Sequence, residues 1–148
     1  MINWIYKPFN ELSLEELYAI LRLRNEVFVV EQNCPYQDLD YKDQYSWHLA
    51  GWDDNNLAAY TRIIPPGISY DEASIGRVVT SPAFRRSGAG RELMQRSIEH
   101  TFQQFHCSNI RIGAQVYLEK FYISLGFSDT GKHYLEDNIP HMEMLLKK

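Results

Sequence analysis

Cysteine is scarce in this 148-residue sequence, and long apolar runs are absent. The two cysteines, Cys34 and Cys107, are too few for a disulfide framework and form no C-x-x-C pair. No apolar stretch approaches the roughly 18–20 residues that span a bilayer. The first residues also lack the basic and apolar segments of a signal peptide. These absences predict a cytoplasmic protein that does not bind a membrane.

Patterns typical of metal and nucleic-acid binding are missing as well. The five histidines show no H-x-x-x-H or H-E-x-x-H spacing, so we expect no metal site. The 15 basic residues stand against 19 acidic ones, and the resulting net charge of −4 argues against nucleic-acid binding.

Charge is unevenly distributed along the chain. Five arginines and one acid lie between Arg77 and Arg96, whereas six acids and one lysine lie between Glu31 and Asp54. A basic and an acidic segment in one small protein suggest two ligands of opposite charge. The alternative is that both segments lie on solvated faces without a ligand.

The apolar pattern predicts one α/β domain over residues 1–148, since domains most often have about 100–150 residues. Ser13 and Glu16 form a capping box at the start of a helix whose pattern fades near Phe28. Further helices are expected at 88–106 and at 118–125, with Gly126 ending the latter. Strands are expected at 2–7, 47–52, 57–64, 74–80, 110–115, 127–134 and 141–146. This order predicts a mixed α/β sheet.

The segment from Ile75 to Leu93 says most about function. It reads as a strand, a short loop with Gly88 and Gly90, and an amphipathic helix, which leaves unpaired N–H groups at the start of the helix. Glycines let a bulky phosphate approach the main chain, and three arginines add positive charge there: Arg85, Arg86 and Arg91. The pattern favours a pyrophosphate ligand, although the glycines by themselves are better explained by a tight turn.

Two common phosphate-binding motifs do not fit this segment. No G-K-S or G-K-T occurs, so the P-loop is absent. Leu93 stands where the Rossmann pattern G-x-G-x-x-G requires its third glycine. Nucleotide hydrolysis and NAD binding therefore lose their main support.

Two motifs resemble those of the GNAT superfamily of acyl-CoA N-acyltransferases. Residues 85–90 (RRSGAG) are similar to the family signature [RQ]-x-x-G-x-[GA], which follows a strand and starts a helix. Residues 121–127 (FYISLGF) are similar to its F-Y-x-x-L-G-F element. Three further segments resemble the ElaA-like branch: 23–40, 113–115 and 139–141.

The resemblance covers nearly the whole chain and implies a single-domain α/β (α+β) GNAT fold. In that fold a mixed central sheet of about six to seven strands is flanked by about four helices. The sheet is splayed to form an acyl-CoA cleft. We therefore expect the strand at 74–80 to lie at this cleft.

The resemblance also implies acetyl-CoA as the cofactor, with CoA as product. It places the pantetheine arm on the strand before the loop that contains Gly88 and Gly90, which we call the glycine turn. A backbone N–H near Val79 would polarise the thioester carbonyl. Amides of the turn would hold the pyrophosphate. The expected cofactor-binding residues are Val78, Val79, Thr80, Arg85, Arg86, Ser87, Gly88, Ala89, Gly90, Arg91, Phe121 and Tyr122. Gln115 and Leu118 depart from the family, many members of which have Asn and Ala there.

Tyr122 is the expected general acid. A phenol has a reference pKa of about 10, so it is protonated at neutral pH and can donate to the departing thiolate. The alternative is that Tyr122 only packs on the sheet. The base that deprotonates the amine is less determined: Glu31 and His141 rank first, and His48 and Glu143 follow.

These observations predict an N-acetyltransferase that moves an acetyl group from acetyl-CoA directly to a primary amine in a ternary complex. The acidic segment 31–54 suggests a cationic acceptor, either a small molecule or a peptide amine. A non-catalytic acyl-CoA-binding sensor or regulatory module is the alternative. A homodimer, common in the family, is left open.

Overall fold

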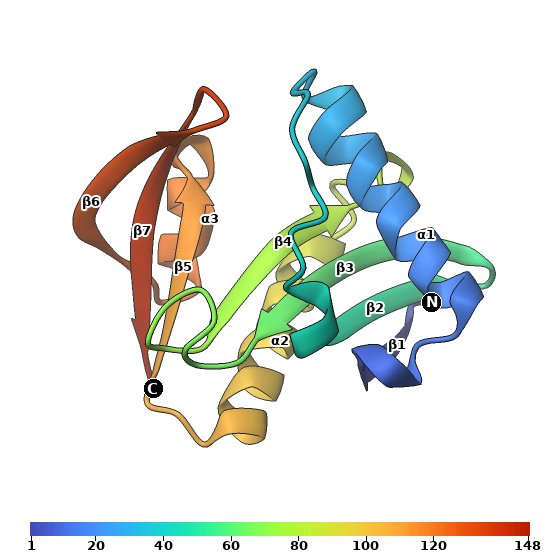
Figure 1. Cartoon of the computed structure of the whole chain (residues 1–148), viewed down its shortest axis with the longest axis horizontal. Helices are drawn as coiled ribbons and strands as arrows, with labels where there is room; N and C mark the ends of the chain where they lie inside the picture. Colours follow the sequence, from blue (N-terminus) through green and yellow to red (C-terminus); the bar gives the residue numbers. More distant parts are fainter.

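The computed structural model describes all 148 residues and contains seven strands and three α-helices (Figure 1). The strands are β1 (Asn3–Pro8), β2 (Trp47–Asp53), β3 (Asn56–Ile64), β4 (Ser74–Thr80), β5 (Asn109–Gln115), β6 (Ser128–Glu136) and β7 (Ile139–Lys147). The helices are α1 (Leu14–Arg24), α2 (Ala89–Phe105) and α3 (Glu119–Ser124). None of them combines the length and apolarity required to cross a bilayer.

The strands form two antiparallel sheets that separate from each other. The first sheet has the order β1-β2-β3-β4, and the second has the order β5-β7-β6. A parallel bridge between Ala73 and Ile110 joins them where β4 and β5 begin. Beyond this bridge β4 and β5 diverge, so the two sheets form the arms of a V (Figure 1). The predicted splayed α/β fold is confirmed.

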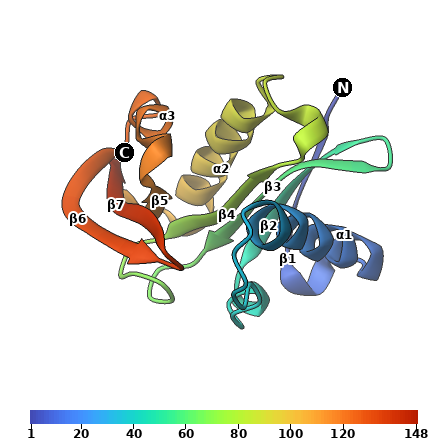
Figure 2. The same ribbon diagram turned by 90° about the horizontal axis from the view of Figure 1, so that it is seen from above.

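Helices α1 and α2 lie on opposite faces of the first sheet (Figure 2). The capping box at Ser13 is confirmed, because its hydroxyl accepts from the Glu16 N–H at 3.0 Å and the Glu16 carboxylate accepts from the Ser13 N–H. Apolar residues of α1 pack on one face in a cluster of Ile20, Leu23, Val27, Ala50, Tyr60 and Val79. A larger cluster joins α2 to both sheets and includes Leu49, Ile63, Leu93, Met94, Ile110, Ile112, Met142 and Met144.

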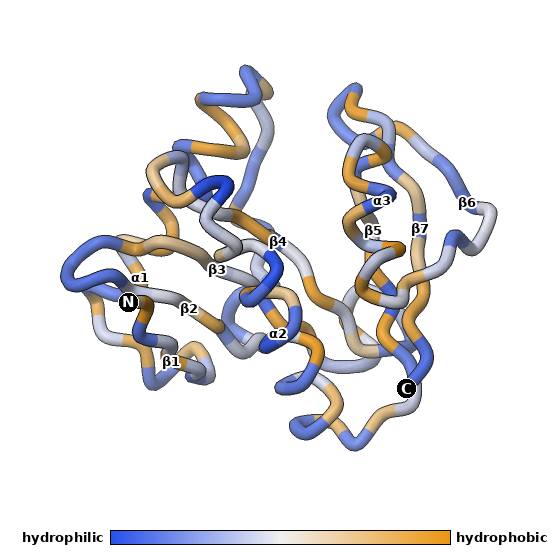
Figure 3. The backbone as a smooth tube through the Cα atoms, turned by 180° about the vertical axis from the view of Figure 1, so that it is seen from behind, coloured by the Kyte–Doolittle hydropathy of each residue, from blue (hydrophilic) through white to orange (hydrophobic).

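The outer strand of the second sheet, β6, is the most exposed strand. Eight of its nine residues are exposed, and Tyr134 is the exception. Seen from behind, the residues of β6 are largely hydrophilic (Figure 3). Polar residues suit an edge strand, because they discourage pairing with other chains.

Two details of the fold differ from the prediction. Three α-helices are present where about four were expected, because the chain after α1 continues as a π-helical segment, Asn25–Glu31, and the other short helical segments are three-residue 3-10 turns. The strands also divide into two sheets with one bridge between them. The predicted role of Gly126 at the end of α3 is confirmed by its φ of +104°.

Candidate active site

A cleft of about 580 Å³ opens between the diverging strands β4 and β5. Since β5 leaves β4 after the Ala73–Ile110 bridge, the facing strand edges lack a neighbouring strand, and their backbone groups are available to a ligand. The cleft is lined by residues 75–80 of β4 and 112–115 of β5, by parts of the π-helical segment and of α3, and by the β6–β7 turn.

The glycine turn lies at one end of this cleft. Gly88 is the N-cap residue of α2 and has a φ of +85°, a conformation that glycine adopts without strain. A Cβ added at Gly88 would meet no atom within 4 Å, so the space over the turn is open. Gly90 lines the cleft, and a Cβ there would lie 3.5 Å from the Thr80 hydroxyl. The N-terminus of a 17-residue helix therefore faces the space where we expect an anion.

Most of the predicted cofactor-binding residues meet in this cleft. Seven of the twelve line it: Val78, Val79, Thr80, Arg85, Gly90, Phe121 and Tyr122. The other five lie in the glycine turn and the first turn of α2, beside the cleft: Arg86, Ser87, Gly88, Ala89 and Arg91. Segments up to 44 residues apart in sequence, from Val78 to Tyr122, thus surround one space.

Arg85 and Glu31 are paired with each other at the cleft. Two hydrogen bonds join the guanidinium to the carboxylate, one of them 2.7 Å long, although both side chains are about two-fifths exposed. The hydrogen bonds from Arg85 lower the pKa of the Glu31 carboxyl group. Glu31 is therefore a weak candidate for the base, since a carboxylate stabilised in its charged form binds protons poorly.

Tyr122 enters the cleft from α3 and is 5% exposed. Its ring packs edge-on against Phe121 and Phe127, with centroids 5.2 and 5.8 Å away. Burial raises the pKa of the phenol, so the hydroxyl carries its proton throughout the working pH range. The side chain both packs in the core and faces the cleft, which joins the two alternatives considered from the sequence.

His141 reaches the same cleft from β7 and is 7% exposed. Its Nδ1 lies 2.8 Å from the carbonyl oxygen of Ile139. Since a carbonyl only accepts, Nδ1 must donate, and in the neutral ring the lone pair lies on Nε2. This Nε2 lies 3.6 Å from a carboxylate oxygen of Glu136, which also lines the cleft. Of the base candidates, His141 has the geometry to accept a proton.

The two remaining base candidates do not line the cleft. His48 is 1% exposed, with its ring nitrogens 2.6 Å from the Tyr60 hydroxyl and 3.0 Å from the Asp43 carbonyl oxygen. Glu143 accepts a hydrogen bond of 2.7 Å from Arg111 on the face of the second sheet. Both side chains therefore form structural contacts outside the cleft and are not suited to act as the base.

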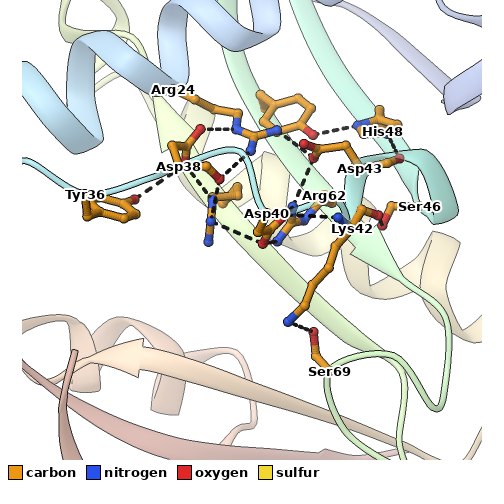
Figure 4. Close-up of polar contacts among 12 residues, drawn as sticks. Arg24, Tyr36, Asp38, Asp40, Lys42, Asp43, Ser46, His48, Arg62 and Ser69 are labelled. Carbon is orange, nitrogen blue, oxygen red and sulfur yellow. Dashed lines mark hydrogen bonds and ion pairs between the residues drawn. The ribbon is translucent and has the colours of Figure 1, made fainter. Parts of the chain in front are cut away.

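The acidic segment and the arginines near it largely neutralise each other (Figure 4). Arg24, on the buried face of α1, donates to Asp38 at 2.9 Å and to Asp43 at 2.7 Å. Arg62 and Arg77 complete the network with further bonds to Asp38, Asp40 and Asp43. Asp38, Asp40 and Asp43 are therefore paired within the protein, so attraction of a cationic ligand by the acidic segment cannot depend on these three residues.

The sequence carried one signal of this buried network. Arg24 follows Ile20 by four residues and precedes Val27 by three, so it occupies a core-facing position of the helix. A charged residue at such a position requires a buried partner. Its acidic partners, 14 and 19 residues further along, lie in a loop whose path cannot be read from periodicity.

The chain is similar to known proteins in both sequence and fold. The profile of the acetyltransferase (GNAT) domain matches residues 10–148. Protein ElaA of Escherichia coli K12 is 42% identical over 146 residues, which are 97% of this chain and 95% of ElaA. The crystal structure of E. coli ElaA matches with a TM-score of 0.93 at 40% identity, over 99% of this chain and 100% of that one. An acyl-CoA N-acyltransferase from Pseudomonas aeruginosa matches with a TM-score of 0.94 at 40% identity, over 99% of both chains.

Proposed function

The chain belongs to the GNAT acetyltransferase family, and from this premise we propose that it transfers an acetyl group from acetyl-CoA to a primary amine, directly and in a ternary complex. Membership of this family supports the transfer of an acyl group from an acyl-CoA. The observation that carries the proposal is the cleft between β4 and β5, which has a helix N-terminus at one end and both Tyr122 and His141 in its walls.

The donor is bound by the main chain. The pantetheine arm lies along the free edge of β4, where Val78, Val79 and Thr80 offer backbone groups in the manner of an added strand. The pyrophosphate accepts hydrogen bonds from the amides of the glycine turn, where the helix dipole favours negative charge. A backbone N–H near Val79 polarises the thioester carbonyl as its oxygen becomes negative.

The reaction requires two proton transfers. The neutral amine attacks the thioester carbon, and the new C–N bond replaces the C–S bond. His141 Nε2 takes a proton from the amine, because Nδ1 is already engaged with the Ile139 carbonyl. Tyr122 donates its phenolic proton to the departing thiolate of CoA. Because burial raises the pKa of the phenol, the hydroxyl is protonated when the thiolate leaves.

The acceptor is a small-molecule or peptide amine with additional positive charge. The acids at 38, 40 and 43 cannot supply the attraction, because the three arginines pair with them. Two other acids, Glu136 and Asp137, line the cleft at the β6–β7 turn, and neither forms an ion pair with lysine or arginine. We therefore propose that these two residues attract a cationic acceptor.

The decisive experiment measures thiol release from acetyl-CoA with a panel of cationic, neutral and anionic amines, alongside calorimetric binding of acetyl-CoA. Turnover that is fastest with cationic amines supports the proposal in full. Turnover that favours neutral or anionic amines contradicts only the charge of the acceptor. Tight cofactor binding without turnover for any amine contradicts the enzyme and favours a sensor module.

A further inference from the structure

A second tyrosine, Tyr134, lies against His141. The two residues face each other across the β6–β7 ladder. Their rings are stacked, with centroids 5.6 Å apart and planes inclined by 20°. Tyr134 is also the one residue of β6 that is not exposed. An edge strand that is otherwise solvated therefore directs one aromatic ring onto the proposed base.

The hydroxyl of Tyr134 occupies a place that only glycine leaves free. A Cβ added at Gly113 of β5 would overlap this hydroxyl, and it would lie 3.2 Å from the hydroxyl of Tyr70. Both hydroxyls therefore converge over Gly113. Tyr70 belongs to the loop that connects β3 to β4, so the contact joins the first sheet to the second.

The loop that carries Tyr70 is itself anchored to the second sheet. Glu72 binds Arg111 of β5 through two hydrogen bonds of 2.9 and 2.7 Å, and Arg111 also binds Glu143 of β7 at 2.7 Å. The Arg111 N–H donates to the Ala73 carbonyl at 3.0 Å. Tyr70 is thus held over Gly113 by a bidentate ion pair and a backbone bond close to it in sequence.

The hydrogen bond of His141 does not by itself fix the ring. A single bond from Nδ1 to the Ile139 carbonyl selects the tautomer but permits the imidazole to tilt about that contact. A stacked ring on one side removes this freedom, provided that the stacked ring is itself held. The Tyr134 ring is held at its hydroxyl end, which packs directly over Gly113 beside the Tyr70 hydroxyl.

We propose that Tyr134 is a positioning residue that, seated over Gly113, keeps Nε2 of His141 directed at the amine. The inference rests on the proposed role of His141 and extends it to residues that do not touch the reacting atoms. The charged and titratable groups around this stack are Glu136 on β6, Glu143 on β7, Arg111 on β5, and Tyr70 and Glu72 on the β3–β4 loop.

The test uses a substitution that displaces Tyr134 without changing it. In Gly113→Ala the new Cβ pushes the Tyr134 hydroxyl away, and we expect kcat to fall about 10- to 100-fold, as for a misplaced catalytic group. The KM for acetyl-CoA is expected to stay within about twofold, because no group assigned to the donor moves. Adding Tyr134→Phe removes the clashing oxygen, and the new methyl group then lies in ordinary contact with the end of the ring, so the ring stays held against His141. The double variant Gly113→Ala/Tyr134→Phe is therefore expected to recover most of the lost rate.

A double-mutant cycle with His141→Gln shows whether the effect passes through the histidine. In the His141→Gln background, Gly113→Ala is expected to cause little further loss, because the group it misplaces is gone. A full additional loss there overturns the proposal, as does a failure of Tyr134→Phe to rescue, which indicates that the new methyl group simply blocks the cleft. If His141→Gln leaves the rate unchanged, the base assignment and this inference fail together, while acyl transfer itself stands.

An NMR measurement tests the positioning without any turnover. The imidazole nitrogen shifts of His141 are expected to report one tautomer, with the proton on Nδ1, in the unaltered protein. Gly113→Ala should keep this tautomer, because the Ile139 carbonyl still selects it, but it should shift and broaden the ring C–H resonances of His141 as the stacked Tyr134 ring moves away; the double variant should restore them. An unchanged spectrum in Gly113→Ala overturns the inference even if no acceptor amine is found, and thermal melts of each variant exclude unfolding as the cause.

Discussion

The replacement Arg24→Met tests the buried ion-pair network. Arg24 has none of its side chain exposed, and it makes charge-assisted bonds of 2.9 Å to Asp38 and 2.7 Å to Asp43. Removing one member of a buried pair typically costs about 3–5 kcal/mol, because the partner stays buried without compensation. Arg77 still contacts Asp38 at 2.7 Å and Arg62 still contacts Asp43 at 3.0 Å. We therefore expect a loss near the lower limit, about 3 kcal/mol.

Urea unfolding followed by tryptophan fluorescence measures this loss. With an m value of about 2 kcal/mol/M, a 3 kcal/mol loss lowers the midpoint by about 1.5 M. Arg22→Met is the matched control: Arg22 lies on the same helix, its side chain is 73% exposed, and its pair with Glu26 spans 3.4 Å. An exposed pair of this kind contributes less than about 1 kcal/mol. If the two variants lose equal stability, the buried network does not stabilise the fold as argued.

Three further predictions concern the site and its pH dependence. Tyr122→Phe is expected to lower kcat by about 100-fold or more with the calorimetric Kd for acetyl-CoA unchanged; near-normal turnover contradicts the general-acid role. Glu31→Gln is expected to leave the shape of the pH–rate profile unchanged, because the hydrogen bonds from Arg85 lower the pKa of Glu31; loss of the acid limb in this variant would restore Glu31 as the base. Urea titrations from pH 8 to pH 3 are expected to show two losses of stability. Burial lowers the pKa of His48, so the unfolded chain binds that proton first and stability falls below about pH 6.5. Burial alone would raise the pKa of Asp43, but Arg24 and Arg62 hold it low, so its contribution is lost below about pH 4. A flat profile between pH 7 and pH 5 in the unaltered protein, or an unchanged one in His48→Gln, contradicts the first step.

Local signals in the sequence were sufficient for most of the fold. The hydroxyl of Ser13 and the carboxylate of Glu16 define the start of α1 within four residues of chain, and Gly126 ends α3 through its own backbone angle. Alternating apolar residues located all seven strands to within about two residues of their observed ends. In each case, the residues that fix the element lie inside it or within two residues of its ends.

The π-helical segment could not be predicted in this way. Asn25–Glu31 follows α1 without a break, and its backbone bonds reach five residues back, as from Gln32 N–H to the Val27 carbonyl at 3.1 Å. A pattern read at 3.6 residues per turn only fades there. The wider turn depends on how Val27 and its neighbours pack against the sheet, which is a tertiary effect.

The candidate site, like the fold, could be predicted from the sequence only in part. The glycine turn and Tyr122 belong to contiguous motifs, so their meeting in one cleft was foreseen. The choice among four base candidates depended on contacts between distant segments, namely Arg85 with Glu31 and Arg111 with Glu143. Such contacts cannot be predicted from neighbouring residues in the sequence. They argue against Glu31 and Glu143 as the base, which the sequence had left as candidates.

The pairing of charges also changes how the cofactor must be held. The basic segment contains five arginines, but Arg77 contacts Asp38, Arg85 contacts Glu31 and Arg96 contacts Glu92. Of the arginines in the basic segment, Arg86 and Arg91 alone are then left without an acidic partner near the glycine turn. Since these two side chains are the unpaired cations there, we expect binding of a diphosphate to depend mainly on the backbone amides at the N-terminus of α2, whose positive end is a property of the helix and not of residue charge. Sequence charge therefore overstated the unpaired positive charge at this end of the cleft, whereas Gly90 does line the cleft, as the glycine pattern led us to expect.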